Sequence, residues 1–192
     1  MDLILASTSP YRRDLLQRLQ IPFRCLPQDA DETPLAEETP QQLVERLALA
    51  KATSISTLNT DSLVIGSDQV ATLDGRIMGK PGHHDAAVAQ LRACSGKEVQ
   101  FYTGLAVVCE STGFRQVHVE PFTVHFRQLS NTAIENYLKR EQPYDCAGSF
   151  KCEGLGIVLF ARLVGDDPTS LEGLPLIALT NILAAAGLGV LN

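Results

Sequence analysis

The residues that could do chemistry begin at positions 7–13, where the sequence Ser-Thr-Ser-Pro-Tyr-Arg-Arg follows a short apolar run. Proline suits the first position of a helix, and Thr8 or Ser9 can cap that end with a hydroxyl. Arg12 and Arg13 then fall in the first turn, where the helix dipole already presents positive charge. Free backbone N–H groups, hydroxyls and two guanidinium groups together predict a site for an anion such as phosphate. The alternative is an exposed helix start whose arginines are merely solvated.

A carboxylate lies at the end of a second apolar run. Asp68 follows residues 63–67, a pattern typical of a strand that is buried on both faces. An ionised carboxylate there is costly unless it is paired or bound to a metal. Ligands of α/β sheets gather at the carboxyl ends of strands, which is where Asp68 and Gln69 lie. The alternative is a structural acid that caps a turn.

An acidic loop at residues 29–40 offers a second carboxylate. Asp31 and Glu32 lie in this proline-flanked segment, where acids usually face water. Magnesium and manganese ions take oxygen ligands and often use one or two carboxylates together with substrate phosphates. Asp31 and Glu32 are therefore candidates, together with Asp68, for binding a divalent cofactor, Mg²⁺ or Mn²⁺, and our hypothesis for the mechanism places this cation at Glu32 and Asp68.

Three further polar residues are candidates on local grounds. Lys51 lies near the end of an expected helix, where a cation suits the dipole, and in isolation this accounts for it. Lys80 lies in the sequence Gly-Lys-Pro-Gly, whose glycines allow close backbone approach. It is therefore either a phosphate clamp or an ordinary turn lysine. Glu153, in a glycine-rich segment, is either a reader of a base edge or a loop acid.

The apolar pattern predicts the elements that carry these residues. Strands are expected at 3–6, 23–26, 62–71, 98–109, 115–127 and 156–163, and helices at 10–19, 40–50, 85–93, 130–139 and within 174–191. The two long strands read as a hairpin across the turn at 111–113. Alternation of strands and helices, with this hairpin, predicts an α/β fold with a mixed sheet. We expect one domain over residues 1–192 and leave open whether it has two lobes around a cleft.

Charge and cysteine usage narrow the class of protein. The net charge of −6 argues against general binding to nucleic acid polymers or anionic membranes, and it makes the basic cluster near Arg12 stand out. A small anion is therefore the expected partner. Five scattered cysteines without a C-x-x-C pair fit reduced thiols in the cytoplasm. No Walker A phosphate loop is present. The apolar run at 174–191 is interrupted by Pro175 and polar residues, which favours a buried helix over a membrane span.

Several segments together resemble the Maf family of nucleotide pyrophosphatases, relatives of the inosine triphosphate pyrophosphatases. They occur in the family's order and span nearly the whole chain: LASTSPYRR at 5–13, DET at 31–33, AKA at 50–52, GSDQV at 66–70, GKP at 79–81 and CAGSFKCEG at 146–154. No single segment is decisive, but their joint occurrence is highly specific. The resemblance implies an elongated mixed β-sheet flanked by helices, with a central cleft.

The resemblance also implies a reaction, in which a nucleoside triphosphate is hydrolysed to the monophosphate and pyrophosphate with a divalent metal. Asp68 would accept the proton of the attacking water. The residues that the resemblance places around the substrate are Ser7, Arg12, Arg13, Glu32, Lys51, Asp68 and Lys80. It further suggests a homodimer, for which the apolar C-terminal helix is a candidate surface or else simply core.

Three positions separate the family's subgroups, and here they hold Tyr11, Gln69 and Glu153. This pattern is similar to the subgroup that acts on 7-methyl-GTP, which typically carries tryptophan, glutamine and glutamate. The cationic 7-methylguanine ring should stack on an electron-rich ring and donate hydrogen bonds to a carboxylate, and Tyr11 and Glu153 offer both. We therefore expect 7-methyl-GTP as substrate. The alternatives are a dTTP/UTP pyrophosphatase of the same family and a non-catalytic nucleotide-binding regulator of cell division.

Overall fold

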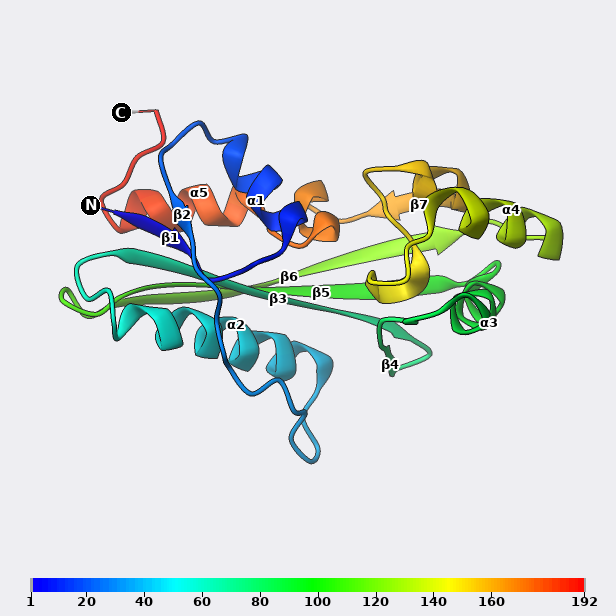
Figure 1. Cartoon of the computed structure of the whole chain (residues 1–192), viewed down its shortest axis with the longest axis horizontal. Helices are drawn as coiled ribbons and strands as arrows, with labels where there is room; N and C mark the ends of the chain where they lie inside the picture. The colour runs from blue at the N-terminus through cyan, green and yellow to red at the C-terminus, as the bar shows by residue number, and fades with distance from the viewer. Residues whose placement is uncertain (1, 192) are drawn as a thin grey trace. The chain divides into compact units, whose positions relative to one another are not determined.

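A computed structural model describes residues 2–191, and Figure 1 shows its elements. The strands are β1 (Leu3–Leu5), β2 (Arg24–Cys25), β3 (Leu63–Leu73), β4 (Arg76–Met78), β5 (Glu98–Cys109), β6 (Phe114–Phe126) and β7 (Phe160–Val164). The helices are α1 (Pro10–Gln17), α2 (Pro40–Ser56), α3 (His84–Cys94), α4 (Asn131–Glu141) and α5 (Leu176–Ala185). The sheet has the order β2-β1-β3-β5-β6-β7, with β4 paired to β3.

The described chain divides into two compact units. The first comprises residues 2–69, 102–120 and 167–191, and the second comprises residues 70–101 and 121–166. Strands β1, β2 and β3 pair in parallel, whereas β6 and β7 pair antiparallel. The predicted mixed α/β sheet is therefore confirmed, and the two strands of the expected long hairpin, β5 and β6, are neighbours in it.

In the first unit, helices cover both faces of the strands. Helices α1 and α5 lie on one side of β1 and β3, and α2 lies on the other (Figure 1). Alternate residues of a strand point to opposite faces. Leu63 and Ile65 accordingly pack in the cluster that contains α1 and α5, whereas Val64 packs with the alanines of α2. Continuing this alternation places Asp68 on the α2 side and both Ser67 and Gln69 on the opposite side.

Helix α2 approaches β3 closely because a glycine faces it. A Cβ at Gly66 would overlap the Ala48 carbonyl oxygen and come within 2.6 Å of the Ala52 nitrogen. The helix begins at Thr39 with a capping box, in which the Thr39 and Gln42 side chains each accept from the other residue's backbone N–H. The cap fixes where α2 starts, and the glycine fixes how near it lies to the strand.

The second unit has a small aromatic core. Phe150 packs edge to face against Phe101, Phe126 and Phe160, with ring centroids 4.8–5.7 Å apart. Helices α3 and α4 are linked by His84, whose Nε2 lies 3.0 Å from the Glu135 carboxylate. This arrangement ties the start of α3 to the middle of α4.

The structure differs from the sequence-based elements at four places. Helix α2 continues to Ser56, and the short β4 was not expected. Residues 156–159, predicted as the start of a strand, instead belong to the 3-10 turn Leu155–Leu159, and the Gly156 N–H bonds back to the Lys151 carbonyl. Helix α5 is ten residues long and follows a separate 3-10 turn, Pro168–Glu172. Within the described residues, the helices are too short or too polar to cross a membrane.

Candidate active site

A buried lysine joins the two carboxylates that the sequence singled out. Lys51 Nζ lies 2.7 Å from Asp68 Oδ1 and 2.7 Å from Glu32 Oε1. The side chains of Lys51 and Asp68 are 5% and 12% exposed, whereas that of Glu32 is 56% exposed. The account of Lys51 as a cation at a helix end is wrong, because α2 runs on to Ser56 and the lysine faces the strand.

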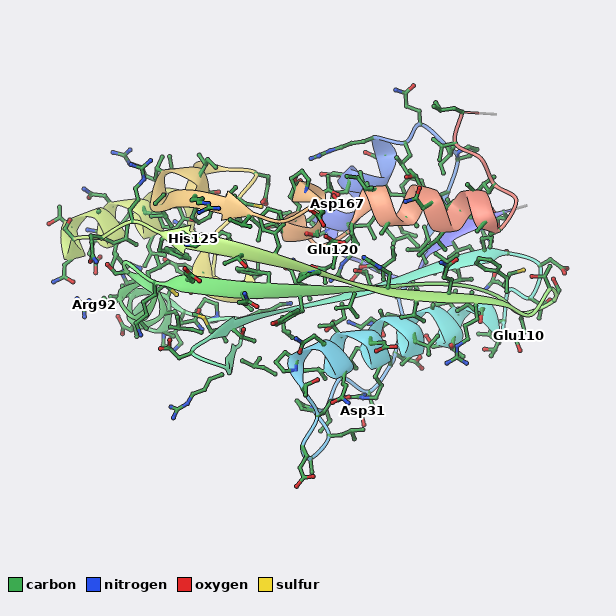
Figure 2. The ribbon with its side chains drawn as sticks, turned by 180° about the vertical axis from the view of Figure 1, so that it is seen from behind. Asp31, Arg92, Glu110, Glu120, His125 and Asp167 are labelled. Carbon is green, nitrogen blue, oxygen red and sulfur yellow. The ribbon has the colours of Figure 1, made fainter. Side chains whose placement is uncertain are left out.

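The acidic loop is shaped so that one acid turns inward. Arg46 on α2 donates to the Thr33 carbonyl oxygen and forms two hydrogen bonds with the Glu38 carboxylate. Asp31 stays exposed, and hydrogen bonds from the Thr33 side chain and backbone hold its pKa below the usual range. Asp31 is labelled on this loop in Figure 2. The loop therefore presents Glu32 to Lys51, and sequence reasoning missed Arg46 as the residue that holds it.

The two arginines of α1 have different surroundings. The Ser9 hydroxyl caps the helix by accepting from the Arg12 backbone N–H at 3.5 Å, and the Ser9 N–H donates to Ser7 Oγ at 3.1 Å. Arg12 Nε donates to the Gly173 carbonyl oxygen at 2.9 Å, whereas Arg13 is half exposed and pairs with Asp14. Burial lowers the pKa of the Arg12 guanidinium, and the negative charges of Asp68 and Glu32 oppose that effect. Arg12 is thus within electrostatic reach of both acids.

On the opposite face of β3, two side chains bind the turn before α5. Ser67 Oγ donates to the Gly173 carbonyl oxygen at 2.9 Å, and Gln69 Nε2 donates to the Ser170 carbonyl oxygen at 2.7 Å. Asp167, labelled in Figure 2, caps this turn by accepting from the Thr169 N–H. This turn was not among the predicted elements, although an acid directly before Pro168 is a recognisable helix-start signal.

The remaining predicted residues lie in the second unit. Lys80 is exposed in the loop between β4 and α3, and its neighbours are held by hydrogen bonds from Gln90 to the Gly79 carbonyl and from the Gly82 N–H to Tyr144. Glu153 is exposed and accepts from the Cys152 thiol at 3.4 Å. The structure therefore gathers Glu32, Lys51 and Asp68 in the first unit, and a shared site with Lys80 and Glu153 stays a prediction.

Comparison with known proteins decides the family. The family profile described as Maf-like protein matches residues 2–186. The chain belongs to the Maf family. Within that family it is 56% identical over 190 residues to the 7-methyl-GTP pyrophosphatase of Albidiferax ferrireducens, covering 99% of this chain and 96% of that protein. It is also 56% identical over 189 residues to the 7-methyl-GTP pyrophosphatase of Nitrosococcus oceani, covering 98% and 95%.

A solved structure shares the fold at low sequence identity. A HAM1 protein from Coxiella burnetii superposes with a TM-score of 0.51 at 14% identity, over 96% of this chain and 99% of that one. This likeness concerns the fold alone. It agrees with the α/β fold predicted from the alternation of strands and helices, whereas the Maf family resemblance is confirmed by the family profile and the relatives.

The acid pair of this Maf family chain is suited in part to a hard cation. Glu32 and Asp68 both aim a carboxylate oxygen at one positive charge, the Lys51 ammonium. Carboxylate oxygens are the ligands that Mg²⁺ and Mn²⁺ prefer. Across residues 2–191, no group of three His, Cys, Asp or Glu side chains is placed to hold a metal ion. The residues therefore fit a cation that takes most of its ligands from water and substrate phosphates.

Proposed function

We propose that this Maf family chain hydrolyses 7-methyl-GTP to 7-methyl-GMP and pyrophosphate. The observation that carries the proposal is the buried Asp68 carboxylate, fixed at 2.7 Å from Lys51 and within reach of the Arg12 charge. A fixed carboxylate beside cations suits proton removal from water next to a polyphosphate. Relatives at 53–56% identity that bear the name 7-methyl-GTP pyrophosphatase support the choice of substrate.

In this mechanism, water attacks the α-phosphorus and pyrophosphate leaves. The new bond joins the water oxygen to phosphorus, and the bond to the bridging oxygen of the leaving group breaks. Lys51 occupies Oδ1 of Asp68, so we assign the water proton to Oδ2. A divalent metal at Glu32 and Asp68 would neutralise phosphate charge. Arg12, Arg13, Lys80 and the Ser7 turn bind the phosphates and stabilise the charge that develops on pyrophosphate.

Base selection is assigned to three side chains, Tyr11, Gln69 and Glu153. Tyr11, half-buried in the first turn of α1, provides a ring on which the cationic base stacks. Glu153 provides a carboxylate for the hydrogen-bond donors on the edge of the guanine. An arginine in place of Tyr11 would repel this base. We further propose that the protein works as a cytoplasmic homodimer. Its C-terminal helix is not the favoured dimer surface, since Leu176, Leu179, Ile182 and Leu183 are buried in the first unit's own core.

A panel of triphosphates tests the substrate. Pyrophosphate release is measured with Mg²⁺ or Mn²⁺ on 7-methyl-GTP, GTP, dTTP, UTP and ITP. We expect kcat/KM for 7-methyl-GTP to exceed that for the others by about tenfold or more, the order of discrimination that one buried contact supplies. Equal rates on 7-methyl-GTP and dTTP would contradict the assignment. Binding of nucleotide without any release of pyrophosphate would favour the alternative function, a non-catalytic nucleotide-binding regulator of cell division.

Replacing the proposed proton acceptor tests the mechanism. Asp68→Asn keeps the shape of the side chain but removes its basicity, and we expect turnover to fall by about 100-fold or more. Asp61→Asn, which changes an exposed acid just before the same strand, is the matched control. Activity of Asp68→Asn within a few-fold of wild type would eliminate its role as base.

Replacing Glu153 tests whether this residue recognises the base. Glu153→Gln removes the negative charge that favours 7-methylguanine, so the ratio of kcat/KM for 7-methyl-GTP over GTP should fall. Glu110→Gln, at an exposed turn that is labelled in Figure 2, should leave this ratio unchanged. An unchanged ratio in Glu153→Gln as well would assign the base contact to another residue.

A further inference from the structure

The turn Pro168–Glu172 and the glycine after it are held by side chains of two strands. Gln69 Nε2 donates to the Ser170 carbonyl oxygen at 2.7 Å and to Thr103 Oγ1 at 3.0 Å. Thr103 Oγ1 in turn donates to the same Ser170 oxygen at 2.9 Å. Thr103 and Ser170 are fully buried. Both hydrogens of the Gln69 amide are therefore engaged inside the protein and are not offered to a ligand.

The same turn ends in a carbonyl that fixes an arginine. The Gly173 oxygen accepts from Arg12 Nε and from Ser67 Oγ, each at 2.9 Å. Gly173 has a φ of +107°, a backbone conformation that other residues rarely adopt, and this aims its carbonyl toward α1. A guanidinium held through Nε keeps its two terminal nitrogens for other partners. These terminal groups suit the oxygens of a phosphate.

Ser67 and Gln69 flank Asp68 in the sequence and point to the opposite face of β3. The strand thus holds the acid on one side and the support of Arg12 on the other. Every contact in this chain of hydrogen bonds lies within the first unit. Removing one link would free the turn, and Arg12 would lose its fixed acceptor without any change to its own side chain.

We propose that Gln69, together with Thr103 and Ser67, is a positioning residue for Arg12, acting through the turn and the Gly173 carbonyl. This inference rests on the proposed function in so far as Arg12 binds the triphosphate. It gives a residue at a subgroup-determining position a role at the phosphate end of the substrate. Thr103 and Ser67 lie outside the subgroup-determining positions, so replacing either should change the rate by the same factor for every base.

Hydrogen exchange at the Arg12 side chain tests the proposal without turnover. Thr103→Val keeps the shape of the side chain but removes the hydroxyl, and Thr103→Ser keeps the hydroxyl. Exchange of the Arg12 Nε–H, followed by NMR, should become about tenfold faster in Thr103→Val, as expected for loss of one supporting hydrogen bond, and return toward wild type in Thr103→Ser. Unchanged exchange in Thr103→Val would overturn the proposal. Because the measurement needs no turnover, its outcome does not depend on whether the protein hydrolyses a triphosphate.

Kinetics provide the second readout. Thr103→Val and Ser67→Ala should each lower kcat/KM by about tenfold on every triphosphate, with the ratios between bases unchanged. In an Arg12→Met background the same changes should lower kcat/KM no further, because Arg12, the residue that they position, is absent. Thr180→Val, which removes a hydroxyl bonded within α5, is the control. An altered base ratio in Thr103→Val, or a loss that persists in the Arg12→Met background, would overturn the proposal.

Discussion

Lys51 shows how one side chain organises the candidate site. Its ammonium faces Asp68 and Glu32 at equal distances, and its side chain is almost fully buried. A buried charge is costly on its own and is retained only with partners. Local patterns suggested that Glu32 and Asp68 share a cation and that Lys51 is a helix-end cation, and only the family resemblance placed Lys51 with the two acids. Their meeting depends on contacts between segments far apart in the chain, which local patterns do not encode.

Removal of the lysine should destabilise the protein strongly. In Lys51→Met, the buried Asp68 carboxylate loses its ion pair, so the free energy of unfolding should fall by about 3–5 kcal/mol in urea denaturation. Lys97→Met is the matched control, because Lys97 pairs with Asp74 at an exposed position. Exposed pairs contribute under about 1 kcal/mol. If the free energy of unfolding falls by a similar amount in the two variants, burial does not increase the contribution of the Lys51 ion pair to stability.

At the scale of elements, local signals predicted helix starts better than helix ends. Ser9, one of the two residues expected to cap the first helix, caps α1, and Thr39 and Ser130 cap α2 and α4. Each cap is a contact within three residues, so the sequence carries it directly. The segment at 155–159 could not be predicted, because its strand-like apolar residues are overridden by the turn that Gly156 closes onto Lys151.

The approach of α2 to β3 gives a prediction at this scale. In Gly66→Ala, the new methyl group would overlap the backbone of α2 at Ala48, so helix and strand must separate. We expect the free energy of unfolding to fall by about 3 kcal/mol or more, at the upper end of overpacking effects. In Gly79→Ala nothing lies within 4 Å of the added Cβ, which makes it the control. Gly66→Ala with wild-type stability would mean that the helix is not held this closely.

For the whole molecule, the motifs predicted the family and the apolar pattern predicted the mixed sheet, because short motifs and apolar periodicity are local properties of the sequence. They did not predict the link between Arg12 and Gly173, which joins residues 161 positions apart. Nor did they reveal the turn that Gln69 binds. Such links form only when distant segments meet in the folded chain. The stability of the fold is therefore the measurable property that depends on all of them.

The pH dependence of global stability can be predicted from a buried thiol. Burial at the end of α3 raises the pKa of Cys94 from its ordinary value of 9.0 to about 12. The folded protein thus keeps this proton to higher pH than the unfolded chain. The contribution of Cys94 to stability is complete below pH 9.0 and is lost as the pH rises toward about 12.

Comparison of wild type with Cys94→Ala isolates this effect. Urea unfolding from about pH 7 to about pH 10.5 should show wild-type stability falling faster than that of the variant above pH 9.0, by up to about 1.4 kcal/mol per pH unit. Tyr137, whose pKa is also raised by burial, titrates in both proteins, so its contribution cancels in the difference. The curves should therefore be parallel below pH 9.0 and converge above it. Curves that stay parallel throughout would mean that the thiol ionises as easily in the folded protein as in the unfolded chain.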